Sequence, residues 1–289
     1  MNENVFLNGE YYRGDEAKIS VDDRGFLFGD GVYEVIRCYG GNYFKLDEHL
    51  ARLERSAGKI YITLPYSRDE IRDICLRLLA KSGVKTGKLY MQVTRGIAPR
   101  IHEFPEGIIP TVMMKVDGFD EAGIAFSKKG IGVMTFPDER WAHCDIKSLN
   151  LLYNVISKQK ARSNGAYEAV FVHEVGVTEC ASSNIFAIMG GKLVTPPEGK
   201  RILSGITRDT VLKLAEDAGI PCEMRYPQKD ELFKADEVFI SNTAQEVSPV
   251  LSIDGKTIAD GKPGEATLKL QKMFEDEIEK ETNFVIGES

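Results

Sequence analysis

The sequence predicts a protein of two domains that mix helices and strands, on three observations. Its 289 residues suffice for two domains of ordinary size, each with its own hydrophobic core. Segments with strand patterns cluster together and do not alternate regularly with helices, as they would in a doubly wound parallel sheet. Residues 119–130 carry Gly, Asp and Lys clusters without sustained periodicity. We therefore expect a small α+β domain over 1–118, a connector over 119–130 and a larger α/β domain over 131–289.

Strand patterns dominate the first domain. The run VFLNGEYYR predicts a hairpin, because Asn8-Gly9 suits the type I′ turn that joins two antiparallel strands. Further strands are expected where apolar and polar residues alternate or branched side chains gather, at 32–39, 43–46, 88–96 and 108–116.

Two helices are expected among these strands. Asp47 would cap the first of them. The second has the clearest signals in the chain, since Ser67 and Glu70 form a capping box, apolar residues recur at helical spacing and Gly83 follows as a stop.

In the second domain, helical periodicity predicts helices at 150–162, 208–218 and 265–281, the second of which would end at Gly219. Short strands are expected between residues 169 and 194 and near Phe239 and Leu251. A dinucleotide-binding fold is not expected, because Gly29-Asp30-Gly31 lacks the third glycine of the G-x-G-x-x-G motif.

Composition and charge argue against several classes of function. The net charge of −7, from 37 basic and 44 acidic residues, includes no basic stripe with interleaved aromatic residues, so nucleic-acid binding is not expected. No apolar run reaches the roughly 18 residues that cross a membrane. The first residues lack a signal-peptide profile, and we expect a cytoplasmic protein. The five cysteines and four histidines are scattered without metal-site spacing, so no metal is expected.

Lys147 is the first candidate for chemistry, because it lies directly before an apolar-striped segment in HCDIKSLNLLYN. A lysine in such a place is most often a solvated side chain whose stem covers apolar surface. A partly desolvated lysine amine can, however, form a Schiff base with a carbonyl compound or with pyridoxal phosphate. That interpretation requires an acid and a phosphate site elsewhere in the chain.

Glu179 in GVTECASSNIF is the candidate acid, although a surface turn is the simpler interpretation. A pyridine ring is a strong electron sink only while its nitrogen is protonated, and a fixed carboxylate beside the nitrogen favours that form. For the phosphate, Gly205 in SGITRDTV allows a tight turn, and Ile206 and Thr207 offer NH groups and a hydroxyl at a helix start. The turn SNTAQE, residues 241–246, is a second candidate, and either turn could be an ordinary cap or loop.

A third group of candidates lies in the loop VTRGIAPRIHEFP, which contains Arg95, Arg100 and His102. Most charges in such loops are merely solvated. An arginine can nevertheless hold a carboxylate through two parallel hydrogen bonds, with a histidine or tyrosine as a further donor, as an amino-acid substrate requires.

Together these residues resemble the D-amino-acid aminotransferases, which are pyridoxal-phosphate enzymes of fold type IV. The similarity covers nearly the whole chain, and it includes DRGFLFGDGVYEVIR, VTRG, CDIKSLNLL, VTE with the following SSN, GITRD and the region of Glu246. Branched-chain aminotransferases and aminodeoxychorismate lyases resemble the chain more distantly. The resemblance implies a two-domain α+β fold of type IV with pyridoxal 5'-phosphate at the domain interface, held largely by the second domain.

The resemblance also implies a role for each site residue. Lys147 would carry the cofactor and move the substrate proton as general base and acid. The residues that would bind the cofactor with it are Glu179, Arg52, Leu203, Gly205, Ile206, Thr207, Asn242 and Thr243. Tyr33, Arg100 and His102 would bind the substrate carboxylate, the last two reaching in from the other subunit of a homodimer.

Two departures from the family pattern concern the cofactor site. Relatives have Gly-Ser-Ser-Ser after the glutamate, where this chain has Cys180-Ala181-Ser182-Ser183, and a serine is usual in place of Asn242. One hydroxyl near the cofactor is lost, which we expect to alter the tuning of intermediates and one phosphate contact.

The implied reaction is transamination between D-amino acids of the D-alanine and D-glutamate class and 2-oxo acids, with ping-pong kinetics. The alternatives are a branched-chain L-amino-acid aminotransferase or an aminodeoxychorismate lyase of the same fold. A protein that carries pyridoxal phosphate without turnover is a third.

Overall fold

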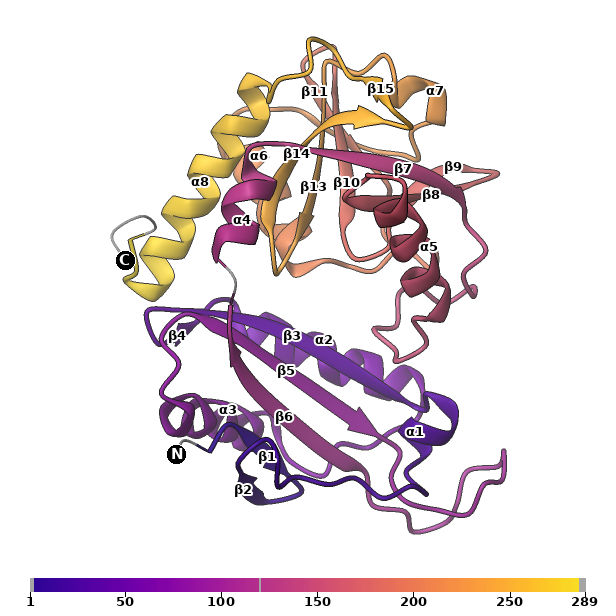
Figure 1. The fold of residues 1–289 in the computed structure, drawn as a ribbon, viewed down its shortest axis with the longest axis vertical. Helices are drawn as coiled ribbons and strands as arrows, with labels where there is room; N and C mark the ends of the chain where they lie inside the picture. The colour runs from indigo at the N-terminus through magenta and orange to yellow at the C-terminus, as the bar shows by residue number, and fades with distance from the viewer. Residues whose placement is uncertain (1–2, 120, 286–289) are drawn as a thin grey trace. The chain divides into compact units, whose positions relative to one another are not determined.

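The computed structural model describes residues 3–119 and 121–285. The chain forms two compact units (Figure 1). Unit 1 comprises Met1–Phe119, Ile146–Asn150 and Lys280–Val285, and unit 2 comprises Asp120–Asp145, Leu151–Glu279 and Ile286–Ser289. The expected division at residue 118 differs from this in one important respect, because the segment that contains Lys147 belongs to unit 1 and not to the second domain.

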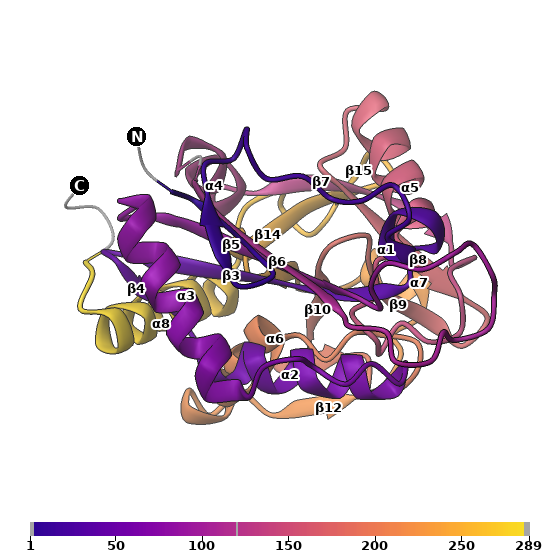
Figure 2. The same cartoon turned by 90° about the horizontal axis from the view of Figure 1, so that it is seen from below.

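The described strands of unit 1 form a six-stranded antiparallel sheet in the order β2-β1-β6-β5-β3-β4. These strands are β1 (Val5–Leu7), β2 (Glu10–Tyr12), β3 (Gly31–Tyr39), β4 (Asn42–Tyr43), β5 (Gly87–Thr94) and β6 (Thr111–Gly118). The helices are α1 (Arg24–Phe28), α2 (Leu46–Lys59) and α3 (Arg68–Ser82). Helices α2 and α3 lie side by side against the same face of the sheet (Figure 2). The core between them contains Ile36, Leu53, Leu78, Leu89 and Met114, all fully buried.

Most of the local signals for a turn or a cap are confirmed, and one of them is wrong. Asn8 and Gly9 both have positive φ angles, 50° and 103°, as a type I′ hairpin requires. Ser67 and Glu70 form the expected capping box at the start of α3, and Gly83 ends the helix in the left-handed conformation. Asp47 is not the cap of α2, because β4 ends early at Tyr43 and Lys45 takes the cap position.

The described strands of unit 2 form a nine-stranded mixed sheet in the order β12-β11-β10-β13-β14-β7-β8-β9, with β15 paired to β14. These strands are β7 (Ile131–Pro137), β8 (Glu168–His173), β9 (Gly176–Cys180), β10 (Asn184–Met189), β11 (Lys192–Thr195), β12 (Cys222–Met224), β13 (Glu237–Asn242), β14 (Glu246–Ile253) and β15 (Lys256–Thr257). The helices are α4 (Glu121–Lys128), α5 (Leu152–Ser163), α6 (Ile206–Asp217), α7 (Lys229–Leu232) and α8 (Glu265–Thr282).

The expectation of an irregular connector over 119–130 is wrong for residues 121–128, which form α4. An eight-residue helix spans about two turns, too few for its periodicity to stand out. Lys128 in its last turn pairs with Glu246 at 2.7 Å and with Glu275 at 2.8 Å, which ties α4 to β14 and α8. Strand β7, which follows it, is also absent from the expected elements, and it lies between two parallel neighbours, β14 and β8.

Among the described residues there is no group of three or more His, Cys, Asp and Glu side chains that could hold a metal ion. All five cysteines are free thiols. No helix in the described ranges combines the length and the apolar character needed to cross a bilayer.

Candidate active site

The expected site residues lie in both units. Unit 1 contains Lys147, Arg52, Tyr33, Arg100 and His102. Unit 2 contains Glu179, Leu203, Gly205, Ile206, Thr207, Asn242 and Thr243.

The main chain around Lys147 is fixed by hydrogen bonds to β3. The Tyr33 NH donates to the Lys147 carbonyl at 3.0 Å, and the Leu149 NH donates to the Gly31 carbonyl at 3.0 Å. The Lys147 NH donates to the Ser56 hydroxyl of α2 at 3.3 Å. The half-buried Lys147 side chain places its Nζ 4.2 Å from the centre of the Tyr33 ring. Helix α5 begins at Leu152, two residues after the expected start at 150.

A buried ion cluster lies close to Lys147. Glu34 is fully buried on β3, and Arg52 donates to its two oxygens from Nε at 2.7 Å and from Nη2 at 2.8 Å. His49 Nδ1 lies 2.8 Å from Glu34 Oε2. Burial alone would raise the pKa of Glu34, but Arg52 and His49 outweigh it and hold that pKa far below the usual range. Burial lowers the pKa of His49, against the influence of Glu34, and the charges of Arg52 and Lys147 add to that lowering.

Glu34 and His49 are not among the expected site residues, although the sequence contains a signal for them. Glu34 shares one face of its strand with the buried residues Val32 and Ile36, so the alternation puts an acid in the core. His49 and Arg52 lie one turn apart on α2, on the face that meets this acid.

The expected carboxylate-binding residues do not meet within one chain. Arg100 and His102 are exposed on the loop after β5, and Tyr33 lies on β3. Among the described residues, no hydrogen bond, ion pair or ring contact joins Tyr33 to either of them. The Arg100 guanidinium lies 4.9 Å from the centre of the Phe28 ring, and the His102 ring lies 5.5 Å from it.

Glu179, at the end of β9, is held by three donors. Arg140 Nη1 donates to Oε1. Asn184 Nδ2 and the Leu203 NH donate to Oε2 at 3.2 Å and 3.0 Å. Burial raises the pKa of Glu179 above its usual value, and Arg140 offsets only part of that rise. A second cation beside Glu179, in addition to Arg140, would therefore stabilise the charged form of this carboxylate.

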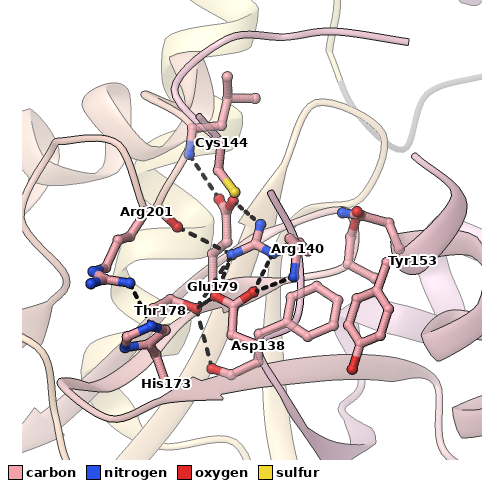
Figure 3. A network of polar contacts seen from close by, with 12 residues as sticks. Asp138, Arg140, Cys144, Tyr153, His173, Thr178, Glu179 and Arg201 are labelled. Atoms are coloured by element: carbon pink, nitrogen blue, oxygen red, sulfur yellow. Dashed lines mark hydrogen bonds and ion pairs between the residues drawn. The ribbon is translucent and has the colours of Figure 1, made fainter. Parts of the chain in front are cut away.

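Arg140 is itself held by a second acid. Its Nε and Nη2 donate to the two oxygens of Asp138, each at 2.8 Å, and Thr178 Oγ1 donates to Asp138 Oδ2 at 2.6 Å. Burial would raise the pKa of Asp138, but the hydrogen bonds from Arg140 and Thr178 hold it below the usual range. Asp138, Arg140 and Glu179 form a chain of alternating charge (Figure 3), which we call the arginine chain. No pattern in the sequence distinguishes Asp138 or Arg140 from ordinary loop charges.

The start of α6 lies against the Glu179 site. Gly205 is the N-cap residue of α6 and provides no side-chain cap. A Cβ at Gly205 would lie 2.0 Å from Asn184 Oδ1, so only glycine lets the helix start approach Asn184 this closely. Asn184 Nδ2 also donates to the Leu203 carbonyl at 3.0 Å. The structure thus brings together Glu179, Leu203 and Gly205, with Ile206 and Thr207 in the following helical turn.

The turn that contains Asn242 is closed by its own side chains. Asn242 Nδ2 donates to Ser183 Oγ at 2.7 Å and to Gln245 Oε1 at 2.8 Å. Asn242 Oδ1 accepts from the NH groups of Ala244 at 2.8 Å and Gln245 at 2.7 Å. All four hydrogen-bonding positions of this amide are therefore used within the protein. Asn242 therefore shapes the turn.

The close approach of Gly205 to Asn184 can be tested by substituting the glycine. Gly205→Ala is expected to displace Asn184 from Glu179, to cost about 1–3 kcal/mol of stability and to weaken binding of pyridoxal phosphate. Thermal unfolding and a cofactor titration measure the two effects. Gly58→Ala in α2 is the matched control, because a Cβ there would meet nothing within 4 Å. It should leave the cofactor affinity unchanged and raise the stability by at most about 1 kcal/mol. Equal cofactor affinity in the two variants would contradict the role given to Gly205.

Comparisons with known proteins give a consistent result. The sequence model described as amino-transferase class IV matches residues 31–253. The chain is 44% identical to a D-alanine aminotransferase of Bacillus licheniformis over 96% of this chain and 98% of that protein. It is 42% identical to a D-alanine aminotransferase of Staphylococcus haemolyticus over 96% and 99%.

Solved structures of branched-chain amino acid aminotransferases are similar in fold. The enzyme of Escherichia coli matches with a TM-score of 0.91 and 28% identity, over 100% of this chain and 97% of that one. The enzyme of the archaeon Thermoproteus uzoniensis, solved with norvaline, matches with a TM-score of 0.85 and 30% identity, over 95% and 94%. The expected α+β fold of type IV is confirmed, and the chain belongs to the class IV aminotransferase family.

Proposed function

We propose that this protein is a pyridoxal-phosphate-dependent aminotransferase that moves an amino group between D-amino acids and 2-oxo acids. The observation that carries the proposal is identity of 42–44% to D-alanine aminotransferases over 96% of the chain, against 28–30% to the branched-chain enzymes. The loop with Arg100 and His102, expected to bind the substrate carboxylate, is present in full.

The residues of unit 2 fit the cofactor. Ser241 Oγ is buried and has no hydrogen-bond partner within the described part of the chain. Ser241 pairs with Asn184 across β13 and β10, and paired residues of neighbouring strands project to the same face. A buried unpaired hydroxyl, a glycine that opens the start of α6 and a buried carboxylate thus lie near one another. A ligand with an anionic group for the hydroxyl and the helix start, and a protonated nitrogen for the carboxylate, would satisfy all three.

Bound pyridoxal phosphate supplies an electron sink that makes the Cα proton of an attached amino acid removable. The Lys147 amine would bind the cofactor and then move this proton. The Glu179 carboxylate would hold the pyridine nitrogen, and Leu203 would lie against the ring. Ile206, Thr207 and Thr243 would hold the phosphate at the start of α6 and in the 241–246 turn. Arg52 would add positive charge, although Glu34 already takes two of its donors.

A homodimer is part of the proposal, because Arg100 and His102 do not meet Tyr33 within one chain. Large apolar side chains are exposed around their loop, namely Val21, Phe26, Ile97, Ile101, Phe104 and Ile109. The two segments that carry them are joined by the Arg24 NH donating to the Gly96 carbonyl at 2.9 Å. Exposed apolar surface of this kind is typical of a subunit interface, and a second copy would cover it. Sedimentation velocity should show a dimer.

The proposal is tested by incubating the purified protein with D-alanine and 2-oxoglutarate and measuring pyruvate. L-alanine, L-leucine and 4-amino-4-deoxychorismate serve as parallel substrates, and the 2-oxo acid that each of them would yield is measured in the same way. We expect a yellow protein that turns over D-alanine far faster than any of the three. Preference for L-leucine would instead support a branched-chain aminotransferase, in line with the fold neighbours. If not even one turnover of any substrate is detected, the protein binds the cofactor without transaminase activity and the proposal is wrong.

Arg100→Ala is expected to lower kcat/KM for D-alanine by more than tenfold, because a lost hydrogen bond to a charged group costs about 1.5–3 kcal/mol. Steady-state kinetics with D-alanine measure this. Arg77→Ala is the control, since Arg77 is exposed on α3 with an ion pair to Asp73 only one turn away. An unchanged kcat/KM in Arg100→Ala would remove Arg100 from the carboxylate site.

A further inference from the structure

The loop that carries Arg100 and His102 begins at a fixed point. It leaves β5 at Gly96, whose φ of 114° is in the region that favours glycine. A Cβ at Gly96 would lie 2.1 Å from the Ile109 carbonyl oxygen, so the two ends of the loop approach closely there. The loop itself is largely exposed, which raises the question of what holds its tip.

Arg24 in α1 holds that tip through the main chain. The Arg24 side chain is buried, and its Nη1 donates to the Ile101 carbonyl at 2.6 Å and to the Glu103 carbonyl at 3.5 Å. Its Nη2 donates to the His102 carbonyl at 3.3 Å. One guanidinium therefore binds three consecutive carbonyls. The first of them follows Arg100 directly and the second belongs to His102.

Asp30 fixes Arg24 in turn. Asp30 Oδ2 accepts from Arg24 Nε at 2.8 Å and from Arg95 Nε at 2.8 Å, and Asp30 Oδ1 accepts from Arg95 Nη2 at 2.9 Å. Burial would raise the pKa of Asp30, but the hydrogen bonds from Arg95 and Arg24 hold it below the usual range. Arg95 also lies with its Cζ 3.6 Å from the centre of the Phe104 ring, farther along the same loop. Both arginines thus connect one acid to the loop.

The Phe28 ring contributes a surface for the side chains. The Arg24 Cζ lies 4.8 Å and the Arg100 Cζ 4.9 Å from the centre of this ring, and the His102 ring lies 5.5 Å from it. Arg100 and His102 therefore share one aromatic contact, although their polar atoms remain available at the exposed surface. Cation–π contacts of this kind restrict where an arginine can point.

We propose that Arg24, with Phe28, is a positioning residue for the substrate carboxylate, because it sets the main chain and the ring against which Arg100 and His102 present their donors. This inference rests on the proposed function of Arg100 and His102. It assigns Arg24 no contact with the substrate. Its effect must therefore appear in binding of the carboxylate and depend on the presence of Arg100.

Arg24→Lys tests the inference, because lysine keeps the positive charge beside Asp30 but cannot bind several carbonyls with a planar fork. We expect KM for D-alanine to rise about tenfold, as for the loss of hydrogen bonds to a charged group, with kcat changed less than about threefold. The absorption band of the bound cofactor should stay unchanged. Phe28→Leu leaves the charges in place and should raise KM in the same direction, so it carries the test if Arg24→Lys does not fold. Arg77→Lys is the exposed control.

A double-mutant cycle separates positioning from a general effect on structure. In an Arg100→Ala background, Arg24→Lys or Phe28→Leu should lower kcat/KM by less than about threefold, because Arg100 is gone and only His102 remains to be positioned. If the losses in kcat/KM from Arg100→Ala and from Arg24→Lys multiply fully in the double variant, the inference is wrong. It is also wrong if KM is unchanged in both Arg24→Lys and Phe28→Leu, or if these variants lower kcat alone. If the unmodified protein does not turn over D-alanine, the proposed function fails first. If it does and these variants behave like the control, only the inference fails.

Discussion

Lys147→Ala lowers kcat for D-alanine by at least about 10²-fold, since the side chain that moves the substrate proton is removed and such groups contribute about 10²–10⁴-fold. Borohydride converts the yellow Schiff base into a stable, colourless secondary amine. After this reduction and gel filtration in denaturant, the same variant no longer retains the near-ultraviolet absorbance of the pyridoxyl group, because the covalent link to the cofactor requires the amine. Steady-state kinetics and absorbance of the reduced, denatured protein measure the two effects. They are independent, because the second requires no turnover.

The Lys147 variant should still fold. The segment 146–150 is fixed by main-chain bonds to β3, which alanine preserves, so its thermal unfolding should stay close to that of the unmodified protein. Lys160→Ala is the control, since Lys160 is an exposed residue in the last turn of α5. Full activity in Lys147→Ala, or loss of the borohydride-fixed pyridoxyl absorbance in the control, would refute the assignment of the cofactor lysine.

Arg140→Met is expected to destabilise the protein by about 3–5 kcal/mol, because it leaves two buried carboxylates, Asp138 and Glu179, without their common partner. It should also raise the pKa of Glu179 further, so that the acid limb of the kcat/KM profile moves to higher pH. Arg140→Lys keeps the charge without the fork and should recover part of both losses. Urea unfolding and a pH–rate profile with D-alanine measure these effects.

The loss of stability in Arg140→Met should depend on pH in one direction only. Arg140 lowers the pKa of Asp138, so its stabilisation of that acid is present above the ordinary pKa and is lost as pH falls through the depressed value. Without Arg140, Glu179 is protonated more readily, and protonation relieves the buried charge. The difference in free energy of unfolding between the two proteins should therefore be largest near neutral pH and decrease toward acid pH. A difference that grows as pH falls would contradict the arginine chain.

The sequence predicted best the features that neighbouring residues determine. The Asn8-Gly9 hairpin and the ends of α3 depend on a few adjacent residues and were found correctly. Helix α4 was missed because two turns give too little periodicity, and β7 was missed because its partners, β8 and β14, lie far away in the sequence.

The sequence predicted those site residues that lie within recognisable motifs. Lys147 lies in the motif CDIKSLNLL and Glu179 in the motif VTE, both of which resemble a known family. Asp138 and Arg140 are isolated charges that only folding brings to Glu179. Glu34 could have been found from the alternation of β3, since an acid on the buried face of a strand requires a partner.

The return of residues 146–150 to unit 1 determines how the protein could be divided experimentally. A fragment that ends at Phe119 would keep the sheet strands of the first unit and its loop arginine but would lack the reactive amine. A fragment that begins at residue 120 would carry that amine without β3, to which its backbone is bonded. Complementation of split halves should therefore restore activity only when both pieces associate, and neither piece should form the coloured adduct alone.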